Sequence, residues 1–124
     1  MIRVGKSARK GRGIFATRKI VCNEMIEEAP VIVVPREQVA HLEATALDDY
    51  YFDWGADEEE AALMLGRCSL CNHSYEPNAQ FVLYPKRRTI GFIALRHIAA
   101  GEEITVNYNG DPASHKRLWF PARP

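Results

Sequence analysis

Two short polar segments carry the side chains that could do chemistry in this chain. The first, Asn72–Asn78, reads Asn-His-Ser-Tyr-Glu-Pro-Asn and follows the apolar run Ala61–Leu65. Amide and imidazole groups near an apolar run must find hydrogen-bond partners or bind a ligand. The second segment, Gly101–Tyr108, has the pattern of a strand and ends on a tyrosine whose hydroxyl can face a pocket.

A third segment of interest is Lys10–Gly13, which precedes the apolar stretch Ile14–Ala16. Its two glycines would let the backbone approach a ligand closely. The segment is not a dinucleotide-binding fingerprint, because no third glycine follows at the required place and no helical pattern opens after it. Taken alone, it favours a simple tight turn.

In order and spacing, these three segments resemble the signatures of the SET-domain lysine methyltransferases, in particular the minimal viral and bacterial members. The resemblance covers residues 3–110. It implies a mainly β, β-clip-like SET fold, with several small sheets around a pseudoknot core and one or two short helices. It also implies methyl transfer from S-adenosylmethionine to the side-chain amine of a protein lysine. We expect a single domain over residues 1–124, with a C-terminal tail at 111–124.

The resemblance assigns the cofactor to the glycine segment and to the Asn-His pair. Backbone groups of the glycine segment would hold the methionine part of S-adenosylmethionine, with Lys10 or Arg12 beside its carboxylate. The Asn72 side chain would meet the amino-acid portion, and the His73 backbone would meet the adenine. Tail aromatics would close over the adenine or the lysine channel, or else anchor the tail. The expected cofactor-binding residues are Lys10, Gly11, Arg12, Gly13, Asn72, His73, Tyr108 and Trp119.

Tyr108 is the expected catalytic residue. A lysine with a pKa of about 10.4 is protonated near pH 7 and cannot attack a sulfonium methyl group. The enzyme must therefore admit the neutral amine through a narrow apolar channel and align it with the methyl–sulfur bond. A phenolic hydroxyl can orient the amine while staying neutral. The alternative is a tyrosine that merely ends an amphipathic strand.

Substrate binding is expected to involve Tyr50, Tyr108 and Phe120. Tyr50 matches a channel-side tyrosine in the viral single-domain relatives, although a core aromatic residue would explain it nearly as well. Many relatives carry a second tyrosine shortly after the catalytic one. Gly110 and Pro112 occupy those places here, so the number of methyl groups transferred stays open.

A metal site is not expected, although Cys68, Cys71 and His73 are close in sequence. A structural zinc ion takes about four ligands, usually from two separated pairs. This chain has one Cys-x-x-Cys pair and, beyond it, only Cys22, so packing of small thiols in the core is the better explanation. In many relatives a cysteine at the place of Tyr75 shares a zinc cluster with a cysteine-bearing tail, and both features are missing here.

The formal net charge is zero, but the charges are unevenly distributed. Seven basic residues and no acidic ones come before residue 20, whereas nine acidic residues and no lysine or arginine lie between Glu37 and Glu60. The acidic stretch is the expected landing surface for a basic substrate, such as a histone tail or another basic protein. Two solvated faces of opposite sign are the alternative. Direct binding of nucleic acid is not favoured, because no recognition helix or stacking platform is evident.

No apolar run approaches the ~20 residues of a membrane span, and the N-terminus lacks the apolar core of a secretory signal. Three cysteines suit a reducing compartment better than a disulfide framework. We therefore expect an intracellular protein with no membrane partner. It would be cytoplasmic if bacterial, and nuclear or chromatin-directed if viral or eukaryotic.

The pattern of apolar residues predicts many short strands and few helices. Pro30 is expected to separate two strands, because proline cannot donate to a ladder. Asp57–Glu60 are expected in the first turn of a helix that ends at Gly66. The expected strands cover residues 2–4, 14–17, 25–28, 31–34, 79–84, 89–95 and 103–108, with a basic hairpin tip at 85–88.

Two further expectations concern activity and assembly. A module that keeps the fold, lacks turnover and binds a basic peptide is the alternative to an enzyme. Intact Asn72, His73 and Tyr108 argue against that alternative, and the missing second tyrosine argues weakly for it. We also expect a homodimer, because Tyr50–Phe52 and Trp54 offer apolar area that so small a body can hardly bury.

Overall fold

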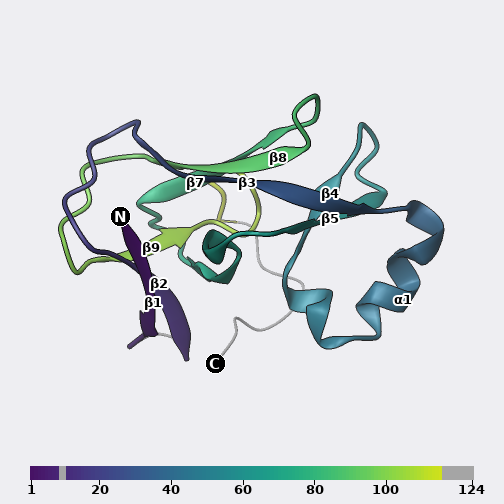
Figure 1. The fold of residues 1–124 in the computed structure, drawn as a ribbon, viewed down its shortest axis with the longest axis horizontal. Coiled ribbons are helices and arrows are strands. Elements are labelled where there is room, and N and C mark those ends of the chain that lie inside the picture. Colours follow the sequence, from purple (N-terminus) through teal and green to yellow (C-terminus); the bar gives the residue numbers. More distant parts are fainter. Residues whose placement is uncertain (9–10, 116–124) are drawn as a thin grey trace.

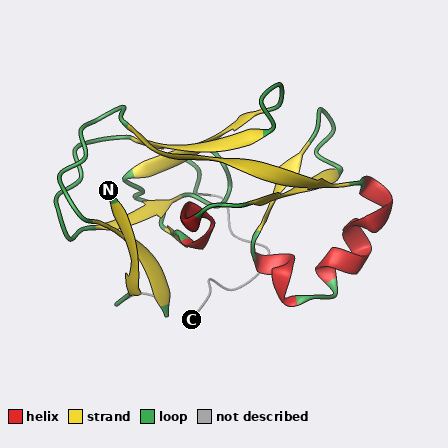
Figure 2. Ribbon diagram, viewed as in Figure 1, coloured by secondary structure: helices red, strands yellow, loops and turns green. Residues whose placement is uncertain are grey.

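Strands dominate the molecule and form two β-sheets (Figure 1 and Figure 2). The computed structural model describes residues 1–8 and 11–115. The four-stranded sheet has the order β1-β2-β9-β6 and consists of β1 (Ile2–Lys6), β2 (Arg12–Ala16), β9 (Glu103–Val106) and β6 (Asn72–His73). The five-stranded sheet has the order β4-β5-β3-β8-β7 and consists of β4 (Tyr51–Trp54), β5 (Glu60–Met64), β3 (Met25–Val34), β8 (Thr89–Ala94) and β7 (Ala79–Tyr84).

Helical structure in the described part of the chain is limited to one short α-helix and three 3₁₀ turns. These are α1 (Val39–Glu43), η1 (Arg36–Gln38), η2 (Ala46–Asp49) and η3 (Arg67–Leu70). Figure 1 shows α1 at the end of the molecule remote from β1 and β2. The predicted mainly β fold with one or two short helices is therefore confirmed. No helix within residues 1–8 and 11–115 is long and apolar enough to cross a membrane.

The last strand, β9, lies between two segments that are distant in sequence. It pairs antiparallel with β2 and parallel with β6. Ile14 and Ile104 are partners in the first of these registers, and both are fully buried, so burial of apolar area stabilises the junction. Asn72 is the partner of Thr105 in the second register. The glycine segment, the Asn-His pair and the approach to Tyr108 thus meet in one sheet.

The helix expected from Asp57 to Gly66 is wrong, because Glu60–Met64 form the strand β5. This strand pairs with β4 on one side and with β3 on the other. Its residues Ala61 and Ala62 have no exposed surface. A strand buried on both faces carries a continuous apolar run, which periodicity alone cannot distinguish from a buried helix. Pairing with two distant strands therefore decided the conformation.

The break expected at Pro30 is also wrong, because β3 runs without interruption over Met25–Val34. The strand changes partner at this residue: it pairs with β8 up to Pro30 and with β5 from Val31 onward. The missing N–H of proline therefore falls where one ladder ends. The Pro30 carbonyl still accepts a hydrogen bond from the N–H of Leu65 at 2.9 Å.

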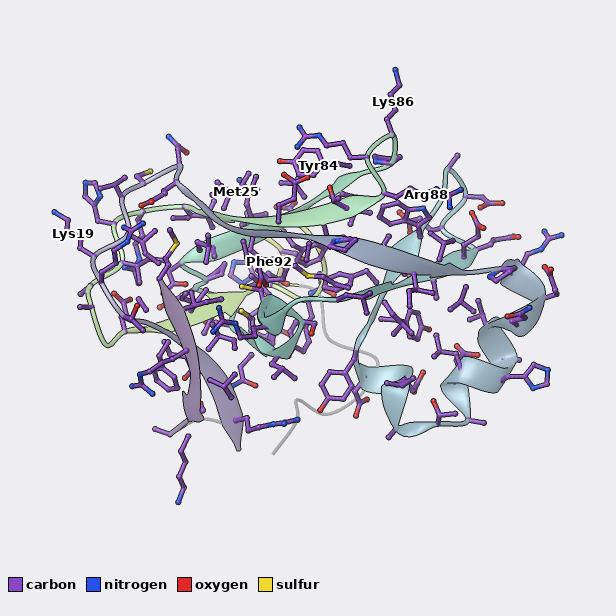
Figure 3. All side chains as sticks on the ribbon, viewed as in Figure 1. Lys19, Met25, Tyr84, Lys86, Arg88 and Phe92 are labelled. Atoms are coloured by element: carbon purple, nitrogen blue, oxygen red, sulfur yellow. The ribbon has the colours of Figure 1, made fainter. Side chains whose placement is uncertain are left out.

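The expected hairpin is confirmed by β7 and β8, which pair along their whole length. Lys86 stands at its tip and points away from the body (Figure 3). Arg87 binds Glu28 at 2.9 Å, and its guanidinium lies 4.2 Å from the centre of the Tyr84 ring. Part of the basic charge of the tip is therefore engaged within the protein.

Trp54 lies in the core, which corrects its expected place at the surface. Its exposed fraction is 6%, and it belongs to the same buried cluster as Phe92, which Figure 3 labels near the centre of the molecule. Phe52 is half-buried and packs against Phe81, with ring centroids 4.9 Å apart. Much of the apolar area assigned to a homodimer interface is thus used inside the protomer. The homodimer itself stays a prediction.

We expect Trp54→Ala to lower the free energy of unfolding by about 3–5 kcal/mol, because it removes a buried indole from the core. Chemical denaturation should show a lower midpoint with an unchanged slope. Leu65→Ala is the control, since Leu65 is 58% exposed, and it should change the free energy by less than about 0.5 kcal/mol. A Trp54→Ala protein that is fully stable but no longer self-associates would place Trp54 in an interface instead.

Candidate functional site

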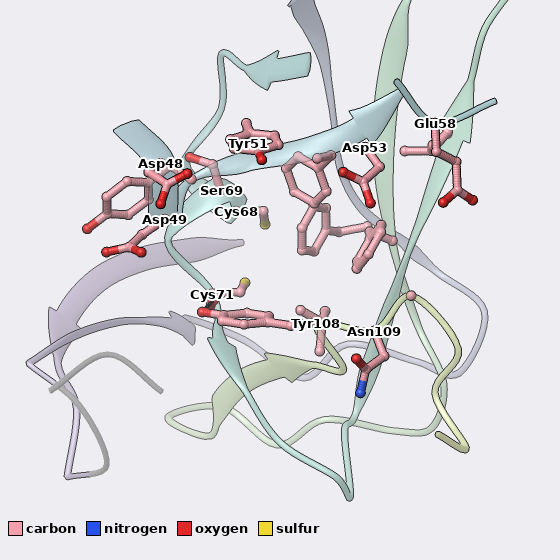
Figure 4. Close-up of a pocket in the computed structure, with 17 residues that line it drawn as sticks. Asp48, Asp49, Tyr51, Asp53, Glu58, Cys68, Ser69, Cys71, Tyr108 and Asn109 are labelled. Atoms are coloured by element: carbon pink, nitrogen blue, oxygen red, sulfur yellow. Dashed lines mark hydrogen bonds between the residues drawn. The ribbon is translucent and has the colours of Figure 1, made fainter. Parts of the chain in front are cut away.

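A pocket of about 590 Å³ opens where residues of both sheets meet the turns η2 and η3 (Figure 4). Its walls are rich in aromatic rings, and Tyr108 lies in the wall beside Cys71. The aromatic residues that line it are Tyr50, Tyr51, Phe52, Phe81, Phe92 and Tyr108. The pocket therefore combines two of the expected substrate residues, Tyr50 and Tyr108, which are far apart in sequence.

Tyr108 is held at both its backbone and its hydroxyl. Its N–H donates to Nδ1 of His73 at 3.0 Å, and its hydroxyl donates to the carbonyl oxygen of Cys71 at 2.7 Å. The hydroxyl is thus fixed on a backbone acceptor next to the pocket. A phenol fixed in this way can orient a polar group that enters the pocket.

The hydrogen bond from Tyr108 determines the tautomer of His73. Because Nδ1 accepts, the proton of the neutral imidazole resides on Nε2. Nε2 is buried and has no hydrogen-bond partner among the described residues. Burial lowers the pKa of His73 below its usual 6.5, which also favours the neutral ring. A buried donor without a partner next to the tyrosine is the kind of group that a bound ligand satisfies.

We expect His73→Asn to reduce the loss of stability at acidic pH. The asparagine oxygen can accept the Tyr108 N–H as Nδ1 does, but it takes up no proton. In the wild type the folded pKa of His73 is lowered, so stability is complete above about pH 6.5 and falls as the pH drops below that value. Thermal melts between about pH 7.5 and 5 should therefore show a smaller decrease for the variant. If both proteins lost the same stability at acidic pH, protonation of His73 would not be the cause of that loss.

Asn72 is buried at the centre of the expected cofactor residues. It is 2% exposed, and its Nδ2 donates to the Arg12 carbonyl at 2.9 Å and to Oε2 of Glu103 at 2.7 Å. Gly13 lies against the side chains of Asn72 and Glu103, and a Cβ at this position would overlap the Glu103 carboxylate. Gly11 has φ +47°, a left-handed conformation that favours glycine. Gly11 therefore suits the backbone conformation just before β2, and Gly13 within β2 leaves room for the Glu103 carboxylate.

The structure brings most of the expected site residues together. Gly11, Arg12, Gly13, Asn72 and His73 lie on or beside the strands that flank β9, and Tyr108 follows β9. Lys10, Trp119 and Phe120, which were also expected in the site, lie outside the described residues.

The mouth of the pocket is acidic. Four of the nine acidic residues counted between positions 37 and 60 line it: Asp48, Asp49, Asp53 and Glu58. Figure 4 shows Asp48 and Asp49 on one side and Asp53 and Glu58 on the other. Burial, and secondarily the charge of Glu58, raises the pKa of Asp53, so a nearby cation would stabilise its ionised form.

The two cysteines of the Cys-x-x-Cys pair are buried at the pocket wall. Cys68 and Cys71 are 1% and 2% exposed, and a hydrogen bond with Cys71, followed by burial, raises the pKa of the Cys68 thiol. In the described ranges, no group of three His, Cys, Asp or Glu side chains could hold a metal ion. The absence of zinc stays a prediction.

Two residues near the site, Asn78 and Glu103, belong to the sequence motifs but had no predicted role. Asn78 accepts the Thr105 N–H at 2.9 Å and donates to the Glu103 carbonyl at 2.8 Å, so it fastens the polar loop to β9. Glu103 binds Asn72 and the Ser7 hydroxyl through its carboxylate. An amide and a carboxylate inside the motifs did indicate that these two residues could form hydrogen bonds. Their partners are distant in sequence, so the sequence could not identify them.

Comparison with known sequences identifies similar proteins. The family model described as SET domain matches residues 11–109. The chain is 32% identical over 120 residues to the histone-lysine N-methyltransferase, H3 lysine-37 specific, of Schizosaccharomyces pombe, covering 96% of this chain and 76% of that protein. It is 34% identical over 111 residues to the H3 lysine-36 specific enzyme of Yarrowia lipolytica, covering 83% of this chain but 14% of that protein.

Solved structures show the same architecture. The crystal structure of a candidate histone methyltransferase from Plasmodium falciparum superposes with a TM-score of 0.64 at 27% identity, over 90% of this chain and 99% of that one. A chain in the structure of ctPRC2 superposes with a TM-score of 0.73 at 23% identity, over 87% of this chain and 14% of that one. The second likeness bears on the fold alone.

Proposed function

Because this chain belongs to the SET-domain family of lysine methyltransferases, we propose that it transfers a methyl group from S-adenosylmethionine to a lysine side chain of a histone. The observation that carries the proposal is Tyr108, hydrogen-bonded through both its N–H and its hydroxyl, in the wall of an aromatic pocket that four acidic side chains also line. Histone H3 is specified in the names of similar proteins, and its basic tail suits these acidic side chains. A histone substrate would place the enzyme at chromatin, in the nucleus of a eukaryotic cell.

One observation supports a fit between these residues and S-adenosylmethionine. The buried Nε2 of His73 lacks a partner among the described residues and lies next to Asn72 and Tyr108, where a bound cofactor could satisfy it. The cofactor would be held by the backbone of Gly11–Gly13, by Asn72 and by His73. When bound, it supplies the electrophilic methyl group.

The pocket would receive the lysine. Its acidic mouth attracts the charged amine and neighbouring basic residues, while the aromatic walls favour the neutral amine further in. In the wall of the pocket, the Tyr108 hydroxyl would orient the amine, because its hydrogen bond to the Cys71 carbonyl holds it in place. Aromatic side chains on several strands would also exclude water from this region.

The test is calorimetric titration with S-adenosylmethionine, followed by mass spectrometry of histone H3 and a mixture of basic proteins incubated with isotopically labelled cofactor. We expect saturable binding and a mass gain on lysine of histone H3. No heat and no thermal shift at millimolar cofactor would overturn the proposal. Binding without any methyl transfer would favour the module that keeps the fold and lacks turnover.

A further inference from the structure

The turn between β7 and β8 presents basic side chains at the end of a protruding hairpin. It covers residues 85–88, reads Pro-Lys-Arg-Arg and is exposed throughout. Figure 3 shows Lys86 at the tip, pointing away from the body of the molecule. Its amine makes no hydrogen bond or ion pair with another residue in the ranges 1–8 and 11–115. Lys86 is therefore open to contact with another molecule.

The hairpin is held at its end, so the tip keeps this place. β7 and β8 pair up to Tyr84 and Thr89, directly before and after the turn. Arg87 binds Glu28 on β3 at 2.9 Å, and its guanidinium lies over the Tyr84 ring. The tip therefore cannot bend into the pocket of its own protomer, and a pocket that receives Lys86 belongs to a separate molecule.

Arg88 has a backbone conformation that an arginine adopts only at a cost. Its φ is +54°, in the left-handed region, which glycine or asparagine adopts at lower free energy. Its guanidinium makes no hydrogen bond or ion pair within the described part of the chain. The fold of the turn therefore does not explain an arginine at this position. A second positive charge close to Lys86 does suit recognition by an acidic surface.

The candidate active site of this protein offers such a surface. Four carboxylates, which Figure 4 shows on two sides of the aromatic walls, line the pocket: Asp48, Asp49, Asp53 and Glu58. Opposite charges on the tip of one copy and around the pocket of another favour their encounter. A lysine side chain has a flexible stem of four carbons, so its amine can enter a pocket while the turn stays outside.

We propose that Lys86 is a methyl acceptor, methylated by a second copy of this chain. The inference rests on the proposed function and adds a substrate, the protein's own hairpin tip. In the reaction, the Lys86 ammonium first gives its proton to water. The lone pair of the amine then forms the N–C bond with the methyl carbon of S-adenosylmethionine. The S–C bond breaks, and its electron pair stays on the sulfur of S-adenosylhomocysteine.

The experiment separates the catalyst from the acceptor, each as the full chain. The catalyst carries Lys86→Arg, which keeps the positive charge but removes the accepting amine. The acceptor is tagged and carries Tyr108→Phe, so its own turnover is low. They are incubated with isotopically labelled S-adenosylmethionine, and histone H3 replaces the acceptor in a parallel reaction. Cleavage after Glu76 and Glu102 releases a fragment whose only lysine is Lys86, so mass spectrometry assigns the label.

We expect label on Lys86 of the acceptor, formed at a rate that rises with the concentration of catalyst. An acceptor with Arg88→Gly should fold as stably, because glycine suits φ +54°, but should be labelled at least about fivefold more slowly. Lys19→Arg in the acceptor is the matched control, because Lys19 is also exposed but lies away from the hairpin (Figure 3). It should leave the rate unchanged.

A catalyst that labels histone H3 but leaves Lys86 unlabelled would overturn this proposal and leave the proposed function intact. Equal rates for the intact and the Arg88→Gly acceptors would overturn recognition of the tip by its charge, on which the proposal depends. Labelling of Lys86 in the wild-type chain at a fractional rate independent of its concentration would overturn the second copy as catalyst. If neither histone H3 nor Lys86 is labelled, the proposed function fails, and this proposal fails with it.

Discussion

Tyr108→Phe is expected to lower single-turnover methyl transfer at least about 100-fold while the Kd for S-adenosylmethionine changes by less than about threefold. The phenyl ring can keep its packing against the His73 ring, whose centroid lies 5.2 Å away. The hydrogen bond from the backbone N–H of residue 108 to Nδ1 of His73 does not involve the hydroxyl and is also kept. What is lost is the hydroxyl that we propose orients the amine, together with its hydrogen bond to the Cys71 carbonyl. Rapid-quench kinetics with labelled cofactor would measure the rate, and calorimetry the affinity.

Tyr75→Phe is the matched control for this experiment. Tyr75 also contacts the His73 ring, with centroids 4.4 Å apart, but it is 39% exposed and does not line the pocket. Its hydroxyl can therefore be removed with little effect on the rate. An unchanged rate in Tyr108→Phe would mean that another group orients the amine, and Tyr50 would be the next residue to replace.

Asn72→Ala is expected to raise the Kd for S-adenosylmethionine at least about tenfold, because a hydrogen bond to a charged ligand group contributes about 1.5–3 kcal/mol. The same change leaves the Arg12 carbonyl and the Glu103 carboxylate without their Asn72 donor. The free energy of unfolding should therefore fall by about 1–3 kcal/mol. Calorimetry below the melting temperature would measure the affinity, and chemical denaturation the stability.

Asn78→Ala separates the two effects of the Asn72 replacement. Asn78 is also 2% exposed and also binds β9 with its amide, through the Thr105 N–H and the Glu103 carbonyl. We expect a similar loss of stability with affinity close to the wild type. If Asn78→Ala weakens cofactor binding as much as Asn72→Ala does, then both residues act only by supporting the fold.

Local chemistry in the sequence determined the mainly β class and the β7–β8 hairpin, and it supplied three segments that the fold brings to one sheet. The hairpin could be predicted because its strands and turn are neighbours, so alternation and turn residues specify it. The catalytic role predicted for Tyr108 depended on the resemblance of the preceding Gly-Glu-Glu-Ile-Thr to a SET-domain motif. The uneven distribution of charge likewise indicated where an acidic surface would lie.

Contacts between residues distant in sequence decided the rest. Ala61–Met64 became part of a strand because β3 and β4 pair with it. Trp54 became a core residue because it joins the buried cluster of apolar side chains. The partner of Glu103 at Ser7 is 96 residues away, so no local pattern could reveal it. Such hydrogen bonds and burial exist only in the folded chain, where β9 pairs with β2 and β6. The sequence thus specified which groups were available, and the tertiary structure decided which of them meet.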